Sequence, residues 1–226
     1  MKHWTFLGEA AIPGSKQFLH LYKGKDDYFI KTSAGGCELM STRKHASEDA
    51  LGTLPCRRLK NAEAARVLIG GLGMGFTLAA ALKAVGPRAE VTVAELVPGV
   101  IDWNRDVLGG HSGHPLDDPR TKVHLGDVAK LLRRQRAYYD VISLDVDNGP
   151  EGLTQSSNDW LYSTPGIVAA QEALAPGGII AYWSAAPDQA FHDRLRRCGF
   201  LVEEVPVFAY GNKGTRHIIW LASADG

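Results

Sequence analysis

Short runs in which apolar and polar residues alternate mark the N-terminal part of the chain. Residues 18–22 and 28–31 alternate in this way, and the polar turn 23–27 separates them. Alternation with a period of two is typical of half-buried strands, and a short polar turn between two such runs predicts a hairpin. We therefore expect a small N-terminal β-hairpin region over residues 1–42.

The hydrophobic pattern then changes to a helical period, which residues 43–59 show first. From Arg66 onward, apolar runs of strand length alternate with amphipathic segments of helix length. We predict strands at 67–69, 90–95, 122–125, 139–145, 178–183, 201–207 and 217–222, and helices at 77–84, 98–108, 128–136, 163–174 and 188–198.

Repeated β–α units favour a parallel sheet with helices on both faces. We therefore predict an α/β fold for residues 43–226, with a Rossmann-like, doubly wound, mostly parallel seven-stranded sheet. Ligands of such sheets bind beyond the carboxyl ends of the strands, where the strand order reverses. The candidate site therefore lies in the loops 70–76, 95–98, 126–128 and 145–160.

Composition and charge narrow the class of protein. The 226 residues include 25 basic and 25 acidic side chains, so the formal net charge is zero. This balance favours neither a nucleic acid nor an anionic membrane as a partner. The N-terminal residues lack the apolar core of a signal peptide, and the apolar runs are too short to span a bilayer. We expect a soluble, cytoplasmic protein.

The cysteines Cys37, Cys56 and Cys198 are far apart and form no CxxC motif. An odd number of isolated cysteines favours neither a disulfide framework nor a structural zinc site. We expect free thiols in a reducing compartment and no bound metal.

The segment RVLIGGLGMGF, residues 66–76, runs from an apolar strand into a glycine-rich turn. Glycines allow a sharp turn and a close approach of the backbone to a ligand, and the free N–H groups of the following helix point at that ligand. The spacing is not a GxGxxG fingerprint, and a plain strand–helix turn would give a similar pattern. The candidate cofactor-binding residues here are Gly70, Gly71, Gly73 and Met74.

Two acids at later strand ends extend this candidate site. Glu95 can accept hydrogen bonds from both hydroxyls of a ribose, or can be a solvated acid. Asp127 can accept a hydrogen bond from the exocyclic amine of an adenine, cap the following helix, or do both. Their neighbours Leu96, Gly126 and Val128 complete the set.

The three loops together resemble those of class I S-adenosylmethionine-dependent transferases. A nicotinamide dehydrogenase shares the glycine turn and the acid after the second strand, but does not usually need the third loop. We therefore expect the cofactor to be S-adenosylmethionine or decarboxylated S-adenosylmethionine.

Longer segments resemble the spermidine synthase (aminopropyltransferase) family of this superfamily. DDPRTKVHLGD at 117–127 is similar to the segment before that family's adenine-binding aspartate, and YYDVISLDVDNGPEG at 138–152 is similar to its catalytic loop. Segments 35–51 and 161–183 and the predicted hairpin also match. The resemblance implies the same fold, an adenosyl-sulfonium donor, a small amine acceptor and a homodimer.

Several positions depart from that family's pattern. Met74 stands where the family has an aspartate that helps to hold the cationic aminopropyl end of the donor, and a thioether cannot pair with an ammonium as a carboxylate can. Glu38, a further candidate for cofactor binding, stands where the family usually has glutamine. Glu48-Asp49 replaces a histidine–glutamate pair. The aspartates of the catalytic loop are two residues apart instead of three.

The loop after the strand 139–145 is the candidate catalytic site. Its two carboxylates can bind a cationic amine, orient the nitrogen lone pair and accept a proton. The alternatives are that they cap the loop, or that the loop binds calcium, for which it lacks the other oxygen ligands. The candidate catalytic residues are Asp145 and Asp147, and the candidate substrate-binding residues are Asp145, Asn148, Trp160 and Tyr162.

Three functions remain open at this stage. Met74 favours methyl transfer from S-adenosylmethionine to a small acceptor that we expect to bear an amine, and we rank this hypothesis first. Asp145, Asp147 and the resemblance favour polyamine synthesis by aminopropyl transfer from the decarboxylated donor. The third hypothesis is a non-catalytic adenosyl-binding module.

Overall fold

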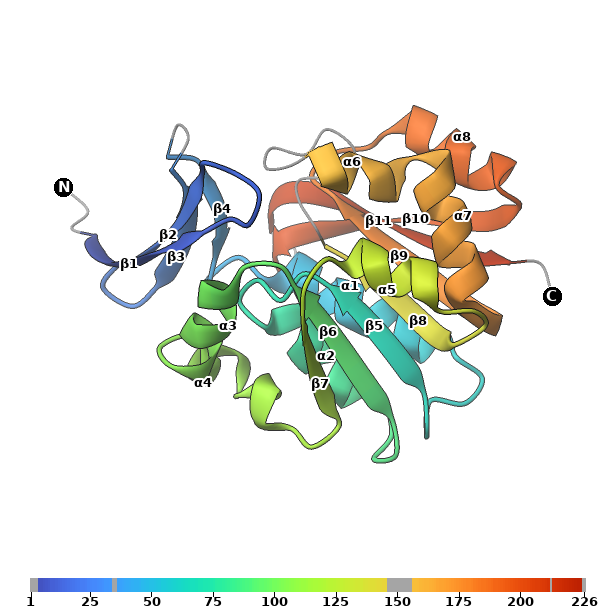
Figure 1. Ribbon diagram of the computed structural model, residues 1–226, viewed down its shortest axis with the longest axis horizontal. Coiled ribbons are helices and arrows are strands. Elements are labelled where there is room, and N and C mark those ends of the chain that lie inside the picture. The colour runs from blue at the N-terminus through green and yellow to red at the C-terminus, as the bar shows by residue number, and fades with distance from the viewer. Residues whose placement is uncertain (1–3, 34–35, 146–155, 212, 225–226) are drawn as a thin grey trace.

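Two β-sheets and the helices packed on the larger of them make up the fold (Figure 1). The structure is a computed structural model that describes residues 4–33, 36–145, 156–211 and 213–224. Within this part of the chain, no helix is long and apolar enough to cross a membrane.

The N-terminal sheet is antiparallel and contains the predicted hairpin. Leu21 pairs with Ile30 across that hairpin, and both side chains are buried. The first strand was not predicted because most of its residues are exposed and a bulge between Phe6 and Gly8 interrupts its register. The strands are β1 (Thr5–Ala11), β2 (Phe18–Lys23), β3 (Tyr28–Thr32) and β4 (Glu38–Ser41).

The larger sheet has seven strands in the order β10-β11-β9-β8-β5-β6-β7. Strand β11 runs in the direction opposite to the other six, so the predicted doubly wound, mostly parallel sheet is confirmed. The strand order reverses between β5 and β8. The strands are β5 (Arg66–Gly70), β6 (Glu90–Glu95), β7 (Thr121–Leu125), β8 (Tyr139–Leu144), β9 (Leu174–Ser184), β10 (Phe200–Tyr210) and β11 (Lys213–Ala224).

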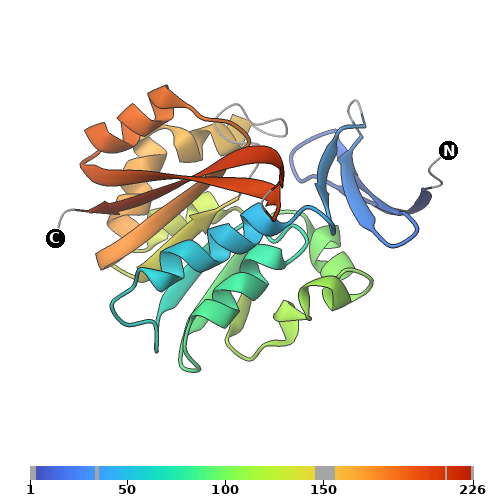
Figure 2. The ribbon, with the colours of Figure 1, turned by 180° about the vertical axis from the view of Figure 1, so that it is seen from behind.

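Helices cover both faces of this sheet, as the two clusters of buried side chains show. Alternate residues of β5 serve the two faces: Val67 and Ile69 pack in one cluster with Leu78, and Leu68 packs in the other with Val128. Helices α1 (Ala46–Arg57) and α2 (Phe76–Ala84) lie on the first face, seen in Figure 2. Helices α5 (Val128–Arg134), α7 (Thr164–Ala173) and α8 (Gln189–Arg197) lie on the second, seen in Figure 1.

Some element boundaries differ from the predictions. The predicted helix 98–108 is divided into α3 (Pro98–Arg105) and α4 (Gly109–Ser112), which a 3-10 turn (Pro115–Asp117) follows. Helix α6 (Ser156–Tyr162) was not predicted, because its sequence SSNDWLY is mostly polar and has no helical period.

Helix α1 approaches α2 closely at Gly52. A Cβ on Gly52 would lie 2.3 Å from the Thr77 carbonyl oxygen and 2.9 Å from the Ala80 Cβ. Only glycine therefore allows this contact. Glu48, one turn earlier on the same face of α1, is thereby brought to the carboxyl edge of the sheet.

We expect Gly52→Ala to lower the free energy of unfolding by about 1–3 kcal/mol, because the added methyl group meets backbone atoms that have no room to move. Urea denaturation measures this change. The control is Gly110→Ala in α4, where the nearest atom to a Cβ is 3.7 Å away. Equal stability of the two variants would show that α1 and α2 do not depend on this close contact.

Candidate functional site

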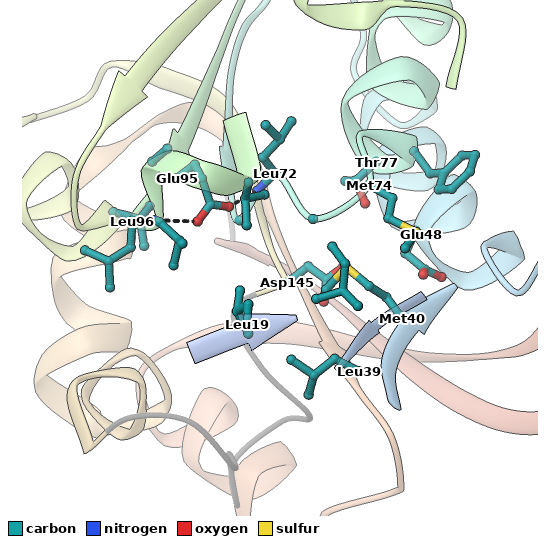
Figure 3. A pocket seen from close by; sticks show the side chains of 18 of the residues that line it. Leu19, Leu39, Met40, Glu48, Leu72, Met74, Thr77, Glu95, Leu96 and Asp145 are labelled. Atoms are coloured by element: carbon teal, nitrogen blue, oxygen red, sulfur yellow. Dashed lines mark hydrogen bonds between the residues drawn. The ribbon is translucent and has the colours of Figure 1, made fainter. Parts of the chain in front are cut away.

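A pocket lies at the carboxyl ends of β5, β6 and β8, between the two sheets (Figure 3). This is where the reversal of strand order places ligands in such folds. The N-terminal region contributes one apolar wall, formed by Ile12, Leu19, Ile30, Leu39 and Met40. Nine of the predicted site residues line the pocket: Gly71, Gly73, Met74, Glu95, Leu96, Gly126, Asp127, Val128 and Asp145.

The glycine turn has a backbone conformation that other residues rarely adopt. Gly71, Gly73 and Gly75 have φ angles of 92°, 52° and 82°, and Gly75 is the N-cap of α2. A Cβ on Gly73 would also lie 3.2 Å from the Met40 sulfur, which comes from the N-terminal sheet. The turn therefore needs glycine for its own geometry, and at Gly73 the close contact with the opposite wall also favours glycine.

Asn104 holds this turn in place, and the sequence did not indicate it. Its Nδ2 donates to the carbonyl oxygens of Gly73 (2.8 Å) and Val100 (2.9 Å), and its side chain is buried. The available signal was a polar residue within the predicted helix 98–108. The hydrophobic pattern alone does not show which turn such a residue faces.

Glu95 is the most deeply buried carboxylate of the pocket, with 8% of the residue exposed. The N–H of Leu72 donates to Oε2 (2.9 Å) and the N–H of Val97 donates to Oε1 (2.8 Å). Burial raises the pKa of Glu95, and these backbone hydrogen bonds oppose that rise. The carboxylate is thus fixed beside the glycine turn, where hydroxyl donors of a ligand can reach it.

Asp127 has the capping role that was one of its two predicted roles. Its Oδ1 accepts a hydrogen bond from the Ala129 N–H (2.8 Å) and so satisfies the first turn of α5. The residue also lines the pocket, next to Gly126. Its second predicted role, recognition of an adenine amine, is therefore compatible with the cap.

Asp145 follows directly after β8 and lies in the middle of the pocket (Figure 3). Its N–H donates to the Gly70 carbonyl oxygen (2.9 Å), which continues the pairing of β8 with β5 by one residue. Gly70 itself ends β5 and does not line the pocket. The backbone hydrogen bond fixes where the Asp145 side chain leaves the sheet.

Glu48 lines the pocket, although it was not among the predicted site residues. It lies on the first turn of α1, at the end of the pocket opposite Glu95 (Figure 3). The Ser47 hydroxyl donates to its Oε2 (2.6 Å). Burial raises the pKa of Glu48, and the bond from Ser47 opposes that rise. The available signal was the unusual Glu48-Asp49 pair in the sequence.

Glu38, a predicted cofactor ligand, does not line the pocket. It is the first residue of β4, and the Lys44 Nζ lies 3.2 Å from its carboxylate. Its neighbours Leu39 and Met40 line the pocket instead. The predicted roles of Asp147 and Asn148 fall outside the described residues.

The two aromatic residues predicted to bind substrate do not line the pocket either. The ring of Trp160 packs under the Arg133 guanidinium, with 3.9 Å from the Cζ to the ring centroid. Tyr162 is buried and packs against Tyr182 and Phe191. Both aromatic rings serve the packing of α6.

Metal ligands do not gather anywhere in the described part of the chain, where no cluster of three or more histidine, cysteine, aspartate or glutamate side chains could hold an ion.

Comparison with known sequences identifies relatives of this chain. The model of the spermine/spermidine synthase domain matches residues 44–194. The polyamine aminopropyltransferase of Pectobacterium atrosepticum is 31% identical over 121 residues, which are 54% of this chain and 40% of that protein. The enzyme of the same name from Mycobacterium tuberculosis is 32% identical over 124 residues, 54% of this chain and 23% of that protein. The matched part thus spans less than half the length of these relatives.

Solved structures show the same fold over nearly the whole chain. Spermidine synthase from Thermotoga maritima superposes with a TM-score of 0.76 at 19% identity, covering 97% of this chain and 72% of that one. A spermidine synthase in complex with the transition state analogue AdoDATO gives a TM-score of 0.74 at 19% identity, covering 99% and 79%. At most about 3% of this chain lies outside either superposition, which is far less than residues 1–42. Both superpositions therefore include the N-terminal sheet.

Proposed function

We propose, on the premise that this chain belongs to the spermine/spermidine synthase domain family, that it transfers an aminopropyl group from decarboxylated S-adenosylmethionine to a small amine. Met74 in the sequence favoured methyl transfer over this reaction. The family and the activity named for the relatives favour the reverse order. The observation that carries the proposal is the pocket itself, whose charged side chains are all acidic among the described lining residues.

The adenosyl part of the donor fits the end of the pocket that contains Glu95 and Asp127. The Glu95 carboxylate can accept hydrogen bonds from the two ribose hydroxyls, and Asp127 can accept one from the adenine amine. The glycine turn after β5, next to Glu95, brings backbone atoms close to the donor. This placement leaves Asp145 in the middle of the pocket, where the sulfonium and the reacting carbon would lie.

The reaction moves charge from sulfur to nitrogen. The lone pair of a neutral amine attacks the aminopropyl carbon bonded to sulfur, and the C–S bond breaks with its electron pair remaining on sulfur. The products are methylthioadenosine and a new ammonium, which then loses a proton. Asp145 can attract the amine, orient its lone pair toward that carbon and accept the proton.

The test is turnover with a panel of linear diamines and polyamines and each of the two donors. We expect methylthioadenosine to be released with the decarboxylated donor, in equal amount to the aminopropylated amine. S-adenosylmethionine should give no methylated amine. Formation of S-adenosylhomocysteine and a methylated amine, without methylthioadenosine, would contradict the proposal.

Methyl transfer remains a second candidate because of one observation. Met74 is buried in the glycine turn and lines the pocket, so this turn supplies no side-chain carboxylate for a cationic donor chain. The same turnover experiment separates the two reactions by their adenosyl products.

A further inference from the structure

The charges that line the pocket are unbalanced. Among the described residues, four carboxylates line it and no lysine, arginine or histidine does. Glu95 and Asp127 lie at the end proposed for the adenosine, and Asp145 lies in the middle. Glu48 is the carboxylate that remains, at the opposite end (Figure 3).

The close contact between α1 and α2 places Glu48 at that end. Gly52 allows α1 to touch the backbone of α2, and the first residues of α2, Phe76 and Thr77, line the pocket beside Glu48. Met74 is drawn at the same end of the pocket in Figure 3. A carboxylate on α1 therefore reaches the region that position 74 of the glycine turn also reaches.

No cation within the described part of the chain forms an ion pair with Glu48. The nearby His45 has Asp49 as its hydrogen-bonding partner, with 2.8 Å from its Nδ1 to that carboxylate, and its ring stacks on Phe76. Its charge acts on Glu48 only as a lesser influence, without an ion pair. The Ser47 hydroxyl is the polar partner of Glu48. Burial raises the pKa of Glu48, and the hydrogen bond from Ser47 and the charge of His45 oppose this rise without cancelling it.

We infer that Glu48 binds the terminal ammonium of the donor's aminopropyl chain and thereby takes the role that Met74 cannot fill. The inference rests on the proposed function. An ammonium here would offset the cost of a buried carboxylate. S-adenosylmethionine carries an additional carboxylate beside its ammonium, which Glu48 would repel. Glu48 therefore also selects between the two donors.

Calorimetric titration with three ligands tests this inference. For Glu48→Gln, the Kd of decarboxylated S-adenosylmethionine should rise about 10- to 100-fold, the range for loss of a charge-assisted hydrogen bond. The Kd of methylthioadenosine, which lacks the aminopropyl chain, should change less than about twofold. The preference for the decarboxylated donor over S-adenosylmethionine should shrink.

Two further variants serve as controls. Asp49→Asn removes the adjacent acid, which does not line the pocket, and should leave all three affinities unchanged. Glu48→Asp keeps the charge and should keep the donor preference. Equal weakening of methylthioadenosine and the decarboxylated donor by Glu48→Gln, or no weakening of either, would overturn the inference.

Failure of the inference is distinguishable from failure of the proposed function. If the wild-type protein releases methylthioadenosine with an amine and Glu48→Gln binds the donor equally well, only the role of Glu48 is wrong. If the wild-type protein binds methylthioadenosine but prefers S-adenosylmethionine to its decarboxylated form, the proposed function itself is wrong.

Discussion

An Asp145→Asn variant is expected to bind the donor and to lose about 10²- to 10⁴-fold in kcat, the range for removal of a general base. Asparagine has nearly the same shape as aspartate, so the backbone bond from residue 145 to the Gly70 carbonyl oxygen should persist. Only the negative charge and the proton acceptor are lost. Methylthioadenosine release at saturating donor and amine measures this effect.

Asp140→Asn is the matched control, because Asp140 lies near the start of the same strand, away from the pocket. Its Oδ2 accepts a hydrogen bond from the Arg66 N–H (2.7 Å), which asparagine can also accept. We expect kcat of this variant to match that of the wild type. If Asp145→Asn retained full kcat, Asp145 would not be the proton acceptor.

The second large effect is expected for Glu95→Ala, which should weaken binding of methylthioadenosine and of both donors alike, by about 100-fold for the loss of two hydrogen bonds to a charged group. The truncation removes the acceptor proposed for the ribose hydroxyls. It also leaves the N–H groups of Leu72 and Val97 without their side-chain acceptor. Calorimetric titration with methylthioadenosine measures the loss.

Glu90→Ala at the other end of β6 provides the comparison. Glu90 forms an ion pair with Lys122 and does not line the pocket, so this variant should bind methylthioadenosine as the wild type does. A Glu95→Ala variant with unchanged affinity for methylthioadenosine would place the ribose elsewhere. Glu48→Gln, by contrast, should leave the affinity for methylthioadenosine nearly unchanged.

The parts of the fold that follow from local pattern could be predicted from the sequence. Apolar runs give β5, β6 and β8, and parallel topology then brings Glu95, the last residue of β6, and Asp145, which follows β8, to one edge. Strand β1 could not be predicted in this way, because its residues are mostly exposed and carry little pattern. Its place in the sheet depends on pairing with β2.

Side-chain direction limited the prediction of the site. Glu38 was selected by its position in a matching segment, and Tyr162 as an aromatic residue expected at the rim of the site, but neither position in the sequence shows where the side chain points. Glu38 pairs with Lys44, and Tyr162 enters the core. Glu48 and Asn104 were missed for the same reason, since each acts through the tertiary contact of a helix with the glycine turn or the pocket.

The contact between Met40 and Gly73 couples the evolution of the two sheets. A Cβ at position 73 would lie 3.2 Å from the Met40 sulfur, so the Met40 side chain would have to shift, and the φ of 52° would strain the turn. A smaller residue at position 40 would relieve only the first of these problems. Substitutions at the two positions should therefore show epistasis.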